Sequence, residues 1–319
     1  MSNTKQQYVK LKHEEHVLKR PDTYVGSIEP TEDELYVMCD GNMKMETMTR
    51  VPGEYKIFDE IIVNAHDQWI RLKEQKEKDP SLIQVKNIKI SFSKETGEIS
   101  VYNDGEGIPV EIHETEKIYI PEMIFGSLLT SSNYNDNDLK HVGGKNGYGA
   151  KLTNIFSTRF TVESVDRYRK KLVRVDYTDN MMPLGDPIVT SWKKEPYTKI
   201  TFVPDFKRFG LEGLTDDITS IMMKRVYDAS AWTDDSVQVY LNGSAIETKS
   251  FKDYVDLYLG DSDKYPRVYE KVNSRWEVIA TVSKDDHFEQ VSFVNGINTF
   301  RGGKHVNYVL DQIRNLLIE

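Results

Sequence analysis

The chain has 319 residues, 38% hydrophobic and 29% charged, a soluble globular balance with room for one large domain or two smaller ones. Its net charge of −9 argues against a surface that binds nucleic acid as a whole. The single cysteine, Cys39, excludes an internal disulfide framework and indicates a reducing compartment, and no apolar run approaches the ~20 residues that span a bilayer.

The first residues of the chain are polar. Residues 1–20 contain Tyr8 as their only aromatic side chain, and we expect an arm that is either disordered or docked on a partner. A turn-rich segment follows at Arg20–Pro30, and the acidic stretch Thr31–Glu34 is expected to be solvated. The pattern then predicts one long helix over Tyr55–Glu77, which a following Asp-Pro pair ends.

This long helix carries a polar stripe. Glu60, Asn64, Asp67 and Arg71 are spaced i, i+4, i+7 and i+11, which places them on one narrow face. The wider opposite face is apolar and is predicted to be core: Phe58, Ile61, Ile62, Ala65, Trp69 and Leu72. The stripe is either a solvated face with an ion pair or a chemical site. A carboxylate can polarise a water molecule, and a carboxamide oxygen one turn away can bind Mg²⁺.

Two strands are expected next, at Ile88–Phe92 and Ile99–Tyr102. The second runs directly into the sequence NDGEGIP, residues 103–109. Asp104, followed by two spaced glycines after a strand, is either part of a tight turn or a carboxylate that accepts a hydrogen bond from a ligand's amino group. An apolar helical turn, a polar segment at Thr130–Asn133 and a lid-like loop then lead to the glycine-rich stretch.

The stretch His141–Ser157 joins a glycine-rich loop to a helix start. Glycines let backbone N–H groups approach a ligand, and a helix N-terminus favours an anion such as a phosphate. The Walker A pattern is absent, because Leu152 follows Lys151. The stretch is therefore a phosphate-binding loop of another kind or a plain surface loop.

The rest of the chain is mixed. Strands dominate from Arg159 to Phe202, and helices are expected at Asp216–Ser230 and Phe251–Leu259 around a strand at Val237–Leu241. A boundary is expected near Gly260–Asp263. Beyond it, three further strands and a helix over His305–Leu317 are expected to form a second unit. About sixty residues make a thin domain, so this unit is either incomplete or completed from outside the chain.

The order of these motifs resembles the Bergerat (GHKL) ATP-binding fold of gyrase-type topoisomerases, ninety-kilodalton heat-shock chaperones, histidine kinases and MutL proteins. Six segments are similar in amino-acid sequence to the ATPase region of eukaryotic-type, including viral, type IIA DNA topoisomerases: RPDTYVGSIE, KIFDEIIVNAHD, NDGEGIPV, IFGSLLTSSNY, GGKNGYGAKLTNIFS and SFVNGINTFRGGKHVNYVLDQI. The resemblance implies an α+β fold, a mixed and largely antiparallel sheet with helices on one face. It also implies a GHKL ATPase domain over residues 1–260, with an exchange arm over 1–20, and an incomplete transducer domain over 261–319.

The resemblance also implies roles for individual residues. Glu60 matches the general base that activates water, Asn64 the Mg²⁺ ligand, and Asp104 the contact to the adenine amino group, with Thr198 near the base. The other implied cofactor-binding residues are Tyr8 (from the partner's arm), Asp67, Arg71, Ile108, Ser131, Ser132, Asn133, Lys145, Asn146, Gly147, Tyr148, Gly149, Ala150 and Lys151. His66 departs from the small or polar residue expected, and Lys145 stands where arginine is frequent.

The implied function is the ATP-binding and ATP-hydrolysing entry gate of a type IIA topoisomerase. Two copies of the chain would close on ATP–Mg²⁺ and trap double-stranded DNA; no membrane partner is expected. The alternatives are another GHKL ATPase, such as a chaperone or a histidine kinase, and a stand-alone nucleotide-binding dimerisation module. A kinase needs an upstream phospho-accepting histidine, and only about fifty residues precede the long helix. An intact Glu60–Asn64 pair argues against a non-catalytic module.

The resemblance places three family elements beyond Glu319: a lysine that touches the γ-phosphate, the TOPRIM acids and the DNA-cleaving tyrosine. We therefore expect this chain to bind ATP, to hydrolyse it poorly by itself and not to cleave DNA. An intracellular location is expected, the nucleus for a cellular protein and the host nucleus or cytoplasm for a viral one.

Overall fold

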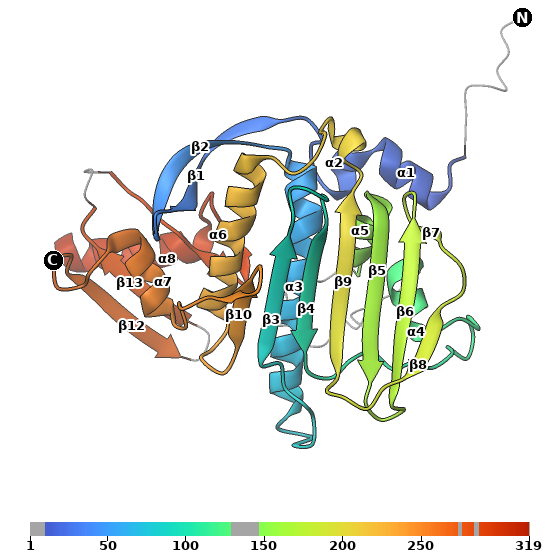
Figure 1. Cartoon of the computed structure of the whole chain (residues 1–319). Helices are drawn as coiled ribbons and strands as arrows, with labels where there is room; N and C mark the ends of the chain where they lie inside the picture. Colours follow the sequence, from blue (N-terminus) through green and yellow to red (C-terminus); the bar gives the residue numbers. More distant parts are fainter. Residues whose placement is uncertain (1–9, 129–146, 274–275, 284–286, 319) are drawn as a thin grey trace, which may run out of the picture.

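The structure, a computed structural model, describes residues 10–128, 147–273, 276–283 and 287–318 (Figure 1). Its α-helices are α1 (His13–Lys19), α2 (Pro21–Tyr24), α3 (Pro52–Gln75), α4 (Ile120–Gly126), α5 (Gly149–Ile155), α6 (Asp216–Trp232), α7 (Phe251–Leu259) and α8 (Lys304–Ile318). Its strands are β1 (Thr31–Cys39), β2 (Asn42–Arg50), β3 (Asn87–Phe92), β4 (Ile99–Asp104), β5 (Ser157–Asp166), β6 (Lys171–Thr178), β7 (Met182–Pro183), β8 (Ile188–Ser191), β9 (Tyr197–Pro204), β10 (Gln238–Leu241), β11 (Ser244–Ala245), β12 (Arg267–Asn273), β13 (Trp276–Thr281), β14 (Phe293–Val294) and β15 (Ile297–Asn298).

One large sheet organises the first part of the chain. Its strand order is β11-β10-β3-β4-β9-β5-β6-β7, with β8 paired to β6. Every pairing is antiparallel except the parallel pairing of β10 with β3. The helices α3, α4 and α5 lie along one face of this sheet (Figure 1). The expected mixed, largely antiparallel sheet with helices on one face is confirmed.

The inner face of the sheet changes from apolar to polar along its strands. Where β4, β9 and β5 cross the core, Val101, Ile200 and Val162 share one row and are buried. One row further on, toward the end of β4, the same face carries Asn103, Thr198 and Ser164. Because side chains alternate between the two faces of a strand, these positions all point the same way as the apolar core. The sheet therefore offers polar groups to whatever lies between it and α3.

Helix α3 crosses this face and begins three residues before the predicted start. Pro52 occupies its first turn, where a proline loses no helical hydrogen bond and its fixed φ suits the helix. The predicted apolar face is buried: Phe58, Ile61, Ile62, Ala65 and Leu72 are each at most 2% exposed, and Trp69 is 9% exposed. Burying each large apolar side chain contributes about 1.5–3 kcal/mol, so packing holds the polar stripe in a defined position.

The hairpin β1–β2 was not expected from the sequence. The stretch Thr31–Glu34, expected to be a solvated segment, forms the first half of β1. The hairpin turns at Asp40 and Gly41, whose φ angles are +50° and +79°. Positive φ at both central residues defines a type I′ turn, for which Asp-Gly is a favoured pair. In β1, Glu32 and Glu34 are exposed on one face, and Val37 is buried on the other.

Residues 13–19 form helix α1, which packs on this chain itself. Val17 of α1 is fully buried in the main hydrophobic cluster, and the His13 ring lies 6.2 Å from the Tyr148 ring, centroid to centroid. Tyr8 lies outside the described residues. The part of the predicted arm that is described is thus a helix docked beside the start of α5.

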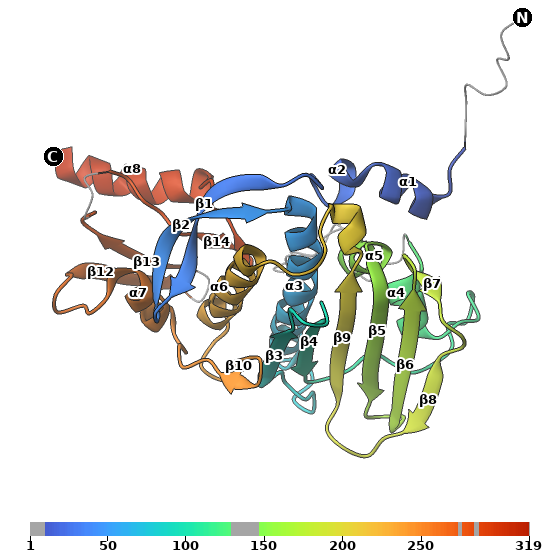
Figure 2. The same ribbon diagram turned by 45° about the horizontal axis from the view of Figure 1, so that its top comes forward.

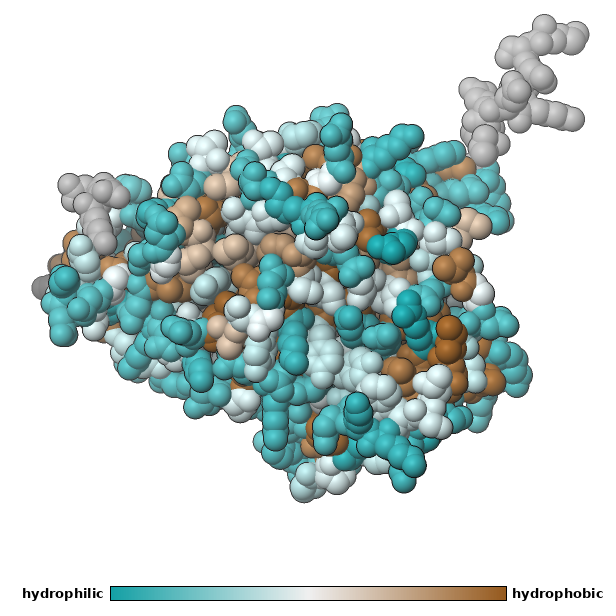
Figure 3. Space-filling view, viewed as in Figure 1, coloured by the Kyte–Doolittle hydropathy of each residue, from teal (hydrophilic) through white to brown (hydrophobic). Residues whose placement is uncertain are grey.

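The segment after α7, called the C-terminal unit below, contains β12–β15 and α8 and lies on the α6 and α7 side of the molecule, away from the β6–β8 edge of the large sheet (Figures 1 and 2). Of the three strands expected in this unit, the last is limited to β14, and α8 has no buried residue among those described. Hydrophobic side chains also gather at the β6–β8 edge of the large sheet (Figure 3). No helix in the described part of the chain is long and apolar enough to cross a membrane.

Candidate functional site

The polar stripe of α3 has Glu60 against the start of α5 and Arg71 in a cavity beside the loop after β4. The Glu60 side chain is 18% exposed and forms an ion pair with Lys56, one turn earlier. Burial lowers the pKa of Lys56, but the carboxylates of Glu60 and Asp59 together outweigh burial, so the pKa lies above its usual value. Asn64 is half-buried, Asp67 is buried and Arg71, at the far end, is exposed. The stripe therefore runs from a carboxylate paired with Lys56 to an exposed guanidinium.

The start of α5 lies directly on Glu60. A Cβ atom added to Gly149, the first residue of α5, would collide with Glu60 Oε2. Gly147, two residues earlier, has a φ of +65°, a left-handed conformation that glycine adopts without strain. The glycine-rich sequence is thus required here for two reasons, a close approach to a carboxylate and a positive φ. Tyr148 and Ala150, between and beside these glycines, pack partly buried against the core.

Lys151 is the cation at this helix start. It is 2% exposed, and its Nζ donates a hydrogen bond to the Gly147 carbonyl at 2.6 Å. Burial lowers the pKa of Lys151 to about 8. An ammonium held in this way binds the carbonyl of its own loop, two residues before the glycine that lies against Glu60.

At the end of β4, the side chains of Asn103 and Asp104 point to opposite faces of the sheet. Asn103 is buried on the inner face, in register with Thr198, whose Oγ1 lies 3.2 Å from Ser164 Oγ. Asp104 points to the other face. Its Oδ1 accepts hydrogen bonds from the backbone N–H groups of Lys86 and Asn87 at 2.7 and 2.8 Å. The Asp104 carboxylate therefore ties β4 to the start of β3 and does not lie with the other candidate residues.

The loop after β4 is held against the end of β5. The backbone N–H of Ile108 donates to Ser164 Oγ at 2.9 Å, and that of Val110 donates to Asp166 Oδ2 at 2.9 Å. A Cβ atom on Gly107 would collide with the Val165 carbonyl oxygen. Ile108 is partly buried on the core cluster. The spaced glycines thus let this loop pass close to β5, and the loop closes the polar end of the inner face.

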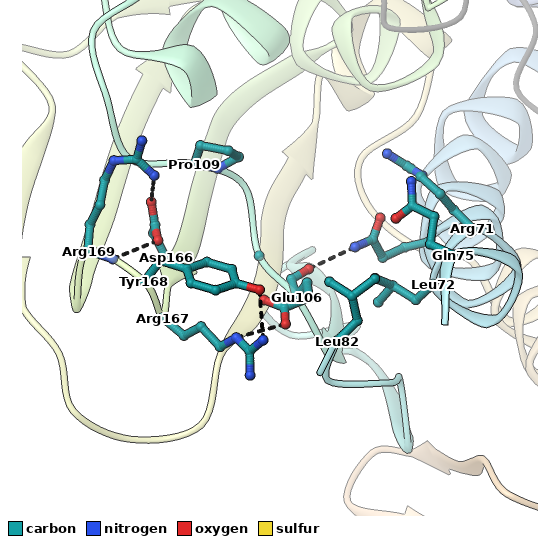
Figure 4. A pocket seen from close by; sticks show the side chains of 12 residues that line it. Arg71, Leu72, Gln75, Leu82, Glu106, Pro109, Asp166, Arg167, Tyr168 and Arg169 are labelled. Carbon is teal, nitrogen blue, oxygen red and sulfur yellow. Dashed lines mark hydrogen bonds and ion pairs between the residues drawn. The ribbon is translucent and has the colours of Figure 1, made fainter. Parts of the chain in front are cut away.

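A cavity of about 370 Å³ lies at the Arg71 end of the stripe (Figure 4). Gln68 and Arg71 of α3 form one wall, and Glu106 and Arg167 form another. Gln68 Nε2 donates to the Glu106 carbonyl at 2.7 Å, and the Glu106 carboxylate pairs with Arg167 Nε at 2.8 Å. The cavity therefore combines charged groups with the apolar side chains of Leu72, Leu82 and Pro109.

The structure thus brings Gly149 against Glu60, with Asn64 one turn further along α3 and Lys151 two residues further along α5. Thr198 lies on the inner face of the sheet beside Asn103 and Ser164. Six predicted residues lie outside the described part of the chain: Tyr8, Ser131, Ser132, Asn133, Lys145 and Asn146. Two residues were missed. Gln68 lies one turn from Asn64, at the edge of the polar stripe, and Asn103 lies two residues after the buried Val101 on the same face of β4. The spacing of Gln68 could be read from the sequence, whereas the inward position of Asn103 needed the tertiary structure.

Comparison with solved structures defines the class of protein first. The ATPase domain of Thermus thermophilus gyrase B matches 74% of this chain and 50% of its own at a TM-score of 0.51 and 20% identity, which shows a shared fold. The chain therefore has the GHKL ATPase fold. No family model matches the sequence.

Closer similarities define the family. The ATPase region of Saccharomyces cerevisiae topoisomerase II superposes with a TM-score of 0.88 at 46% identity, over 99% of this chain and 81% of that one. The ATPase and transducer domains of topoisomerase II from Balamuthia mandrillaris give 0.88 at 44% identity, over 98% and 78%. The chain belongs to the family of eukaryotic type IIA DNA topoisomerases and corresponds to their ATPase region. The expected resemblance is confirmed, and the chaperone and kinase alternatives are not favoured.

The curated relatives are much longer than this chain. DNA topoisomerase 2 of Arabidopsis thaliana is 48% identical over 318 residues, which are 98% of this chain and 21% of that protein. The Saccharomyces cerevisiae protein is 47% identical over 326 residues, 96% of this chain and 22% of its own length. The chain therefore spans about a fifth of the relatives it matches.

Proposed function

We propose that this chain binds ATP with Mg²⁺ between α3 and the polar end of the sheet and hydrolyses it there. The observation that carries this proposal is the contact of Gly149 with Glu60, because it joins a helix start to a half-buried carboxylate. Backbone N–H groups at a helix start and the Lys151 ammonium suit phosphate oxygens, and a carboxylate beside them suits the activation of water. In phosphoryl transfer, such positioning and electrostatic stabilisation supply most of the catalysis.

The roles follow the site from the sheet to the loop. Asn103 and Thr198 would hold the adenine, since a carboxamide and a hydroxyl can both donate and accept hydrogen bonds at its edge. Glu60 would accept the proton of the attacking water, and Lys151 would hold phosphate oxygens. Gly147, Tyr148 and Ala150 would contribute backbone groups, and Asp67, Arg71 and Ile108 would support the cavity around the nucleotide. Tyr8, Ser131, Ser132, Asn133, Lys145 and Asn146 keep their predicted nucleotide contacts.

The residues present fit a Mg²⁺ ion held jointly with phosphates. Among the described residues, no group of three or more His, Cys, Asp and Glu side chains could hold a metal ion alone. Mg²⁺ in nucleotide sites is commonly held by one or two side-chain oxygens, the substrate phosphates and water. Asn64, half-buried one turn from Glu60, supplies such an oxygen. The ion would neutralise phosphate charge when bound, while Asn64 fixes its position relative to the base.

As part of a type IIA topoisomerase, the chain would act as an ATP-operated gate inside the cell. Two copies would close around double-stranded DNA, with arm exchange through Tyr8, and would act in the nucleus or, for a viral protein, in the host nucleus or cytoplasm. Closure by a ligand requires that ATP bind the closed dimer better than the open state.

The molar mass of the chain in solution, measured with and without Mg²⁺ and a non-hydrolysable ATP analogue, tests this proposal. We expect a shift from monomer to dimer that requires both ligands. Deletion of residues 1–9, which leaves α1 intact, is expected to abolish the shift. Binding of the analogue without any change in mass would contradict gating by this chain alone, and no binding would contradict the nucleotide site itself.

Substitutions at the end of β4 distinguish the role of Asn103 in nucleotide binding from that of Asp104. We expect Asn103→Ala to weaken binding of an ATP analogue by about ten- to a hundredfold, because a buried hydrogen-bond partner of the base is lost. Asp104→Ala is expected to change that affinity less than threefold and to lower the melting temperature, since it releases the backbone N–H groups of Lys86 and Asn87 at the start of β3. Titration calorimetry and thermal unfolding measure the two effects. The reverse pattern would restore Asp104 as the adenine contact.

The affinity for nucleotide should depend on pH through Lys151. Its pKa of about 8 in the free protein means that it loses its proton above that pH, whereas bound phosphate favours the charged form. The dissociation constant of an ATP analogue is therefore expected to rise about tenfold from pH 7 to pH 9. Lys151→Met should bind more weakly at pH 7 and show a flat profile over this range. A slope that persists in this variant would assign the titration to another group.

A further inference from the structure

A turn of the C-terminal unit reaches the helix that carries Glu60. The hairpin β14–β15 turns at Asn295 and Gly296, whose φ angles are +50° and +73°. These two residues, called the knuckle below, form a type I′ turn, for which Asn-Gly is a preferred pair. Its backbone lies against α3 and α6, far away in the sequence. The knuckle is thus a place where the C-terminal unit contacts the ATP-binding part of the chain.

Arg225 of α6 connects the knuckle to α3. It is 1% exposed; its Nε donates to Asp59 Oδ1 at 2.6 Å, and its Nη2 donates to the Gly296 carbonyl oxygen at 2.8 Å. Burial disfavours its charge, but Asp59, Tyr55 and Asp228 outweigh burial and raise its pKa above the usual value. One buried guanidinium therefore binds both the knuckle and α3. Asp59 directly precedes Glu60 on that helix.

The knuckle also fits α3 by shape. A Cβ atom on Gly296 would come within 2.9 Å of His66 Cε1 and Nδ1. His66 is 2% exposed, two turns along α3 from Asp59, and its ring packs 4.1 Å from the Trp232 ring, centroid to centroid. The Trp232 ring in turn lies 5.5 Å from the Arg225 guanidinium. The position of Gly296 is therefore set on two sides, by a hydrogen bond and by an aromatic wall that leaves no room for a methyl group.

We propose that the knuckle is the docking contact through which the C-terminal unit sets the position of α3, with Arg225 as the positioning residue. If the knuckle moves, either its hydrogen bond to Arg225 breaks or Arg225 moves with it. In the second case Asp59 also moves, together with the turn of α3 that contains Glu60. Packed interiors respond to such shifts by discrete repacking. Nucleotide at Glu60 and Asn64 and the docked knuckle would then stabilise each other, because coupling between two sites is reciprocal. This second statement rests on the proposed function; the docking itself does not.

Gly296→Ala tests the docking, and the chain offers a matched control. Gly243 follows Asn242 in the turn between β10 and β11, with φ angles of +85° and +47°, and no atom lies within 4 Å of its Cβ position. Gly243→Ala therefore introduces the same left-handed strain without a collision. His66→Ala removes the wall that the new methyl group would strike. The double variant, His66→Ala with Gly296→Ala, completes a cycle that isolates the contact.

Hydrogen exchange of the full chain without nucleotide gives the first readout. In Gly296→Ala, we expect the amides of α3 between Tyr55 and His66 to exchange about tenfold faster than in the wild type. The Gly243→Ala variant should leave these amides unchanged, and the double variant should match His66→Ala alone. Equal exchange in the two glycine variants, or no recovery in the double variant, would overturn the docking.

Addition of Mg²⁺ and a non-hydrolysable ATP analogue gives the second readout. In the wild type and in Gly243→Ala, nucleotide should slow exchange at residues 293–298; in Gly296→Ala this response should be lost while the analogue still binds. An unchanged response in Gly296→Ala would overturn the coupling. If the wild type binds no nucleotide, the proposed function fails, and the exchange without nucleotide still decides whether the knuckle docks.

Discussion

Replacing Glu60 with Gln is expected to lower the rate of ATP hydrolysis by about 10²- to 10⁴-fold, the range that loss of a general base gives. The amide is nearly the same size as the carboxylate and still fits against Gly149, so the helix start should keep its place. It cannot accept the proton of the attacking water. The dissociation constant for an ATP analogue is therefore expected to change less than about threefold. Single-turnover hydrolysis together with equilibrium binding measures both quantities.

Glu74→Gln is the matched control for this experiment. Glu74 is an exposed residue of the same helix, and its substitution makes the same change of charge away from the site. It should leave hydrolysis within about twofold of the wild type, as for other exposed surface changes. If Glu60→Gln also hydrolyses ATP at the wild-type rate, Glu60 is not the base. If it loses binding instead, the carboxylate serves to build the site.

Replacing Arg225 with Met is expected to lower the free energy of unfolding by about 3–5 kcal/mol, because it leaves the Asp59 carboxylate buried without its partner. The side chains of this pair are 1% and 11% exposed, so water cannot replace the lost contact. Urea unfolding followed by tryptophan fluorescence measures the loss, and Trp232 reports directly from beside Arg225. A domain is typically stable by 5–15 kcal/mol, so the effect takes a large share of the total.

Two further variants give this measurement its meaning. Arg174→Met removes a surface ion pair with Asp176, in which the arginine side chain is 47% exposed, and should cost less than about 1 kcal/mol. The double variant, Arg225→Met with Asp59→Asn, should recover part of the loss because the unpaired charge is gone. If Arg225→Met lowers the free energy of unfolding by no more than Arg174→Met does, the buried pair does not stabilise the fold.

Much of the site could be predicted from the sequence because it depends on local periodicity. The spacing of Glu60, Asn64, Asp67 and Arg71 along one helix defines a stripe whatever the helix packs against. The apolar residues between them define the opposite face, and the structure buries that face as predicted. The glycines before Lys151 indicate a close backbone approach, and the structure shows what is approached, the Glu60 carboxylate. The order of the motifs was also sufficient to predict the family, and the comparisons confirm that prediction.

The choice between Asn103 and Asp104 needed the tertiary structure. Adjacent residues of a strand point to opposite faces, so a shift of one position exchanges an inward group for an outward one. Which face is inward depends on where α3 lies, and that is a contact between distant segments. The carboxylate signal in the sequence favoured Asp104, but its hydrogen bonds to β3 became visible only when β3 and β4 were paired.

By itself, the sequence determined the elements whose pattern is local: the α3 stripe, the strands β3, β4 and β10, the helices α6 and α7, and the glycine loop. It also determined the family, because several such motifs occur together in one order. Only the tertiary structure decided which face of β4 is inward, that the charged β1–β2 segments form a hairpin on the core, and that Gly296 reaches Arg225 and His66. These features arise from packing between residues far apart in the chain, whose energies depend on shape and burial and leave no periodic trace in the sequence.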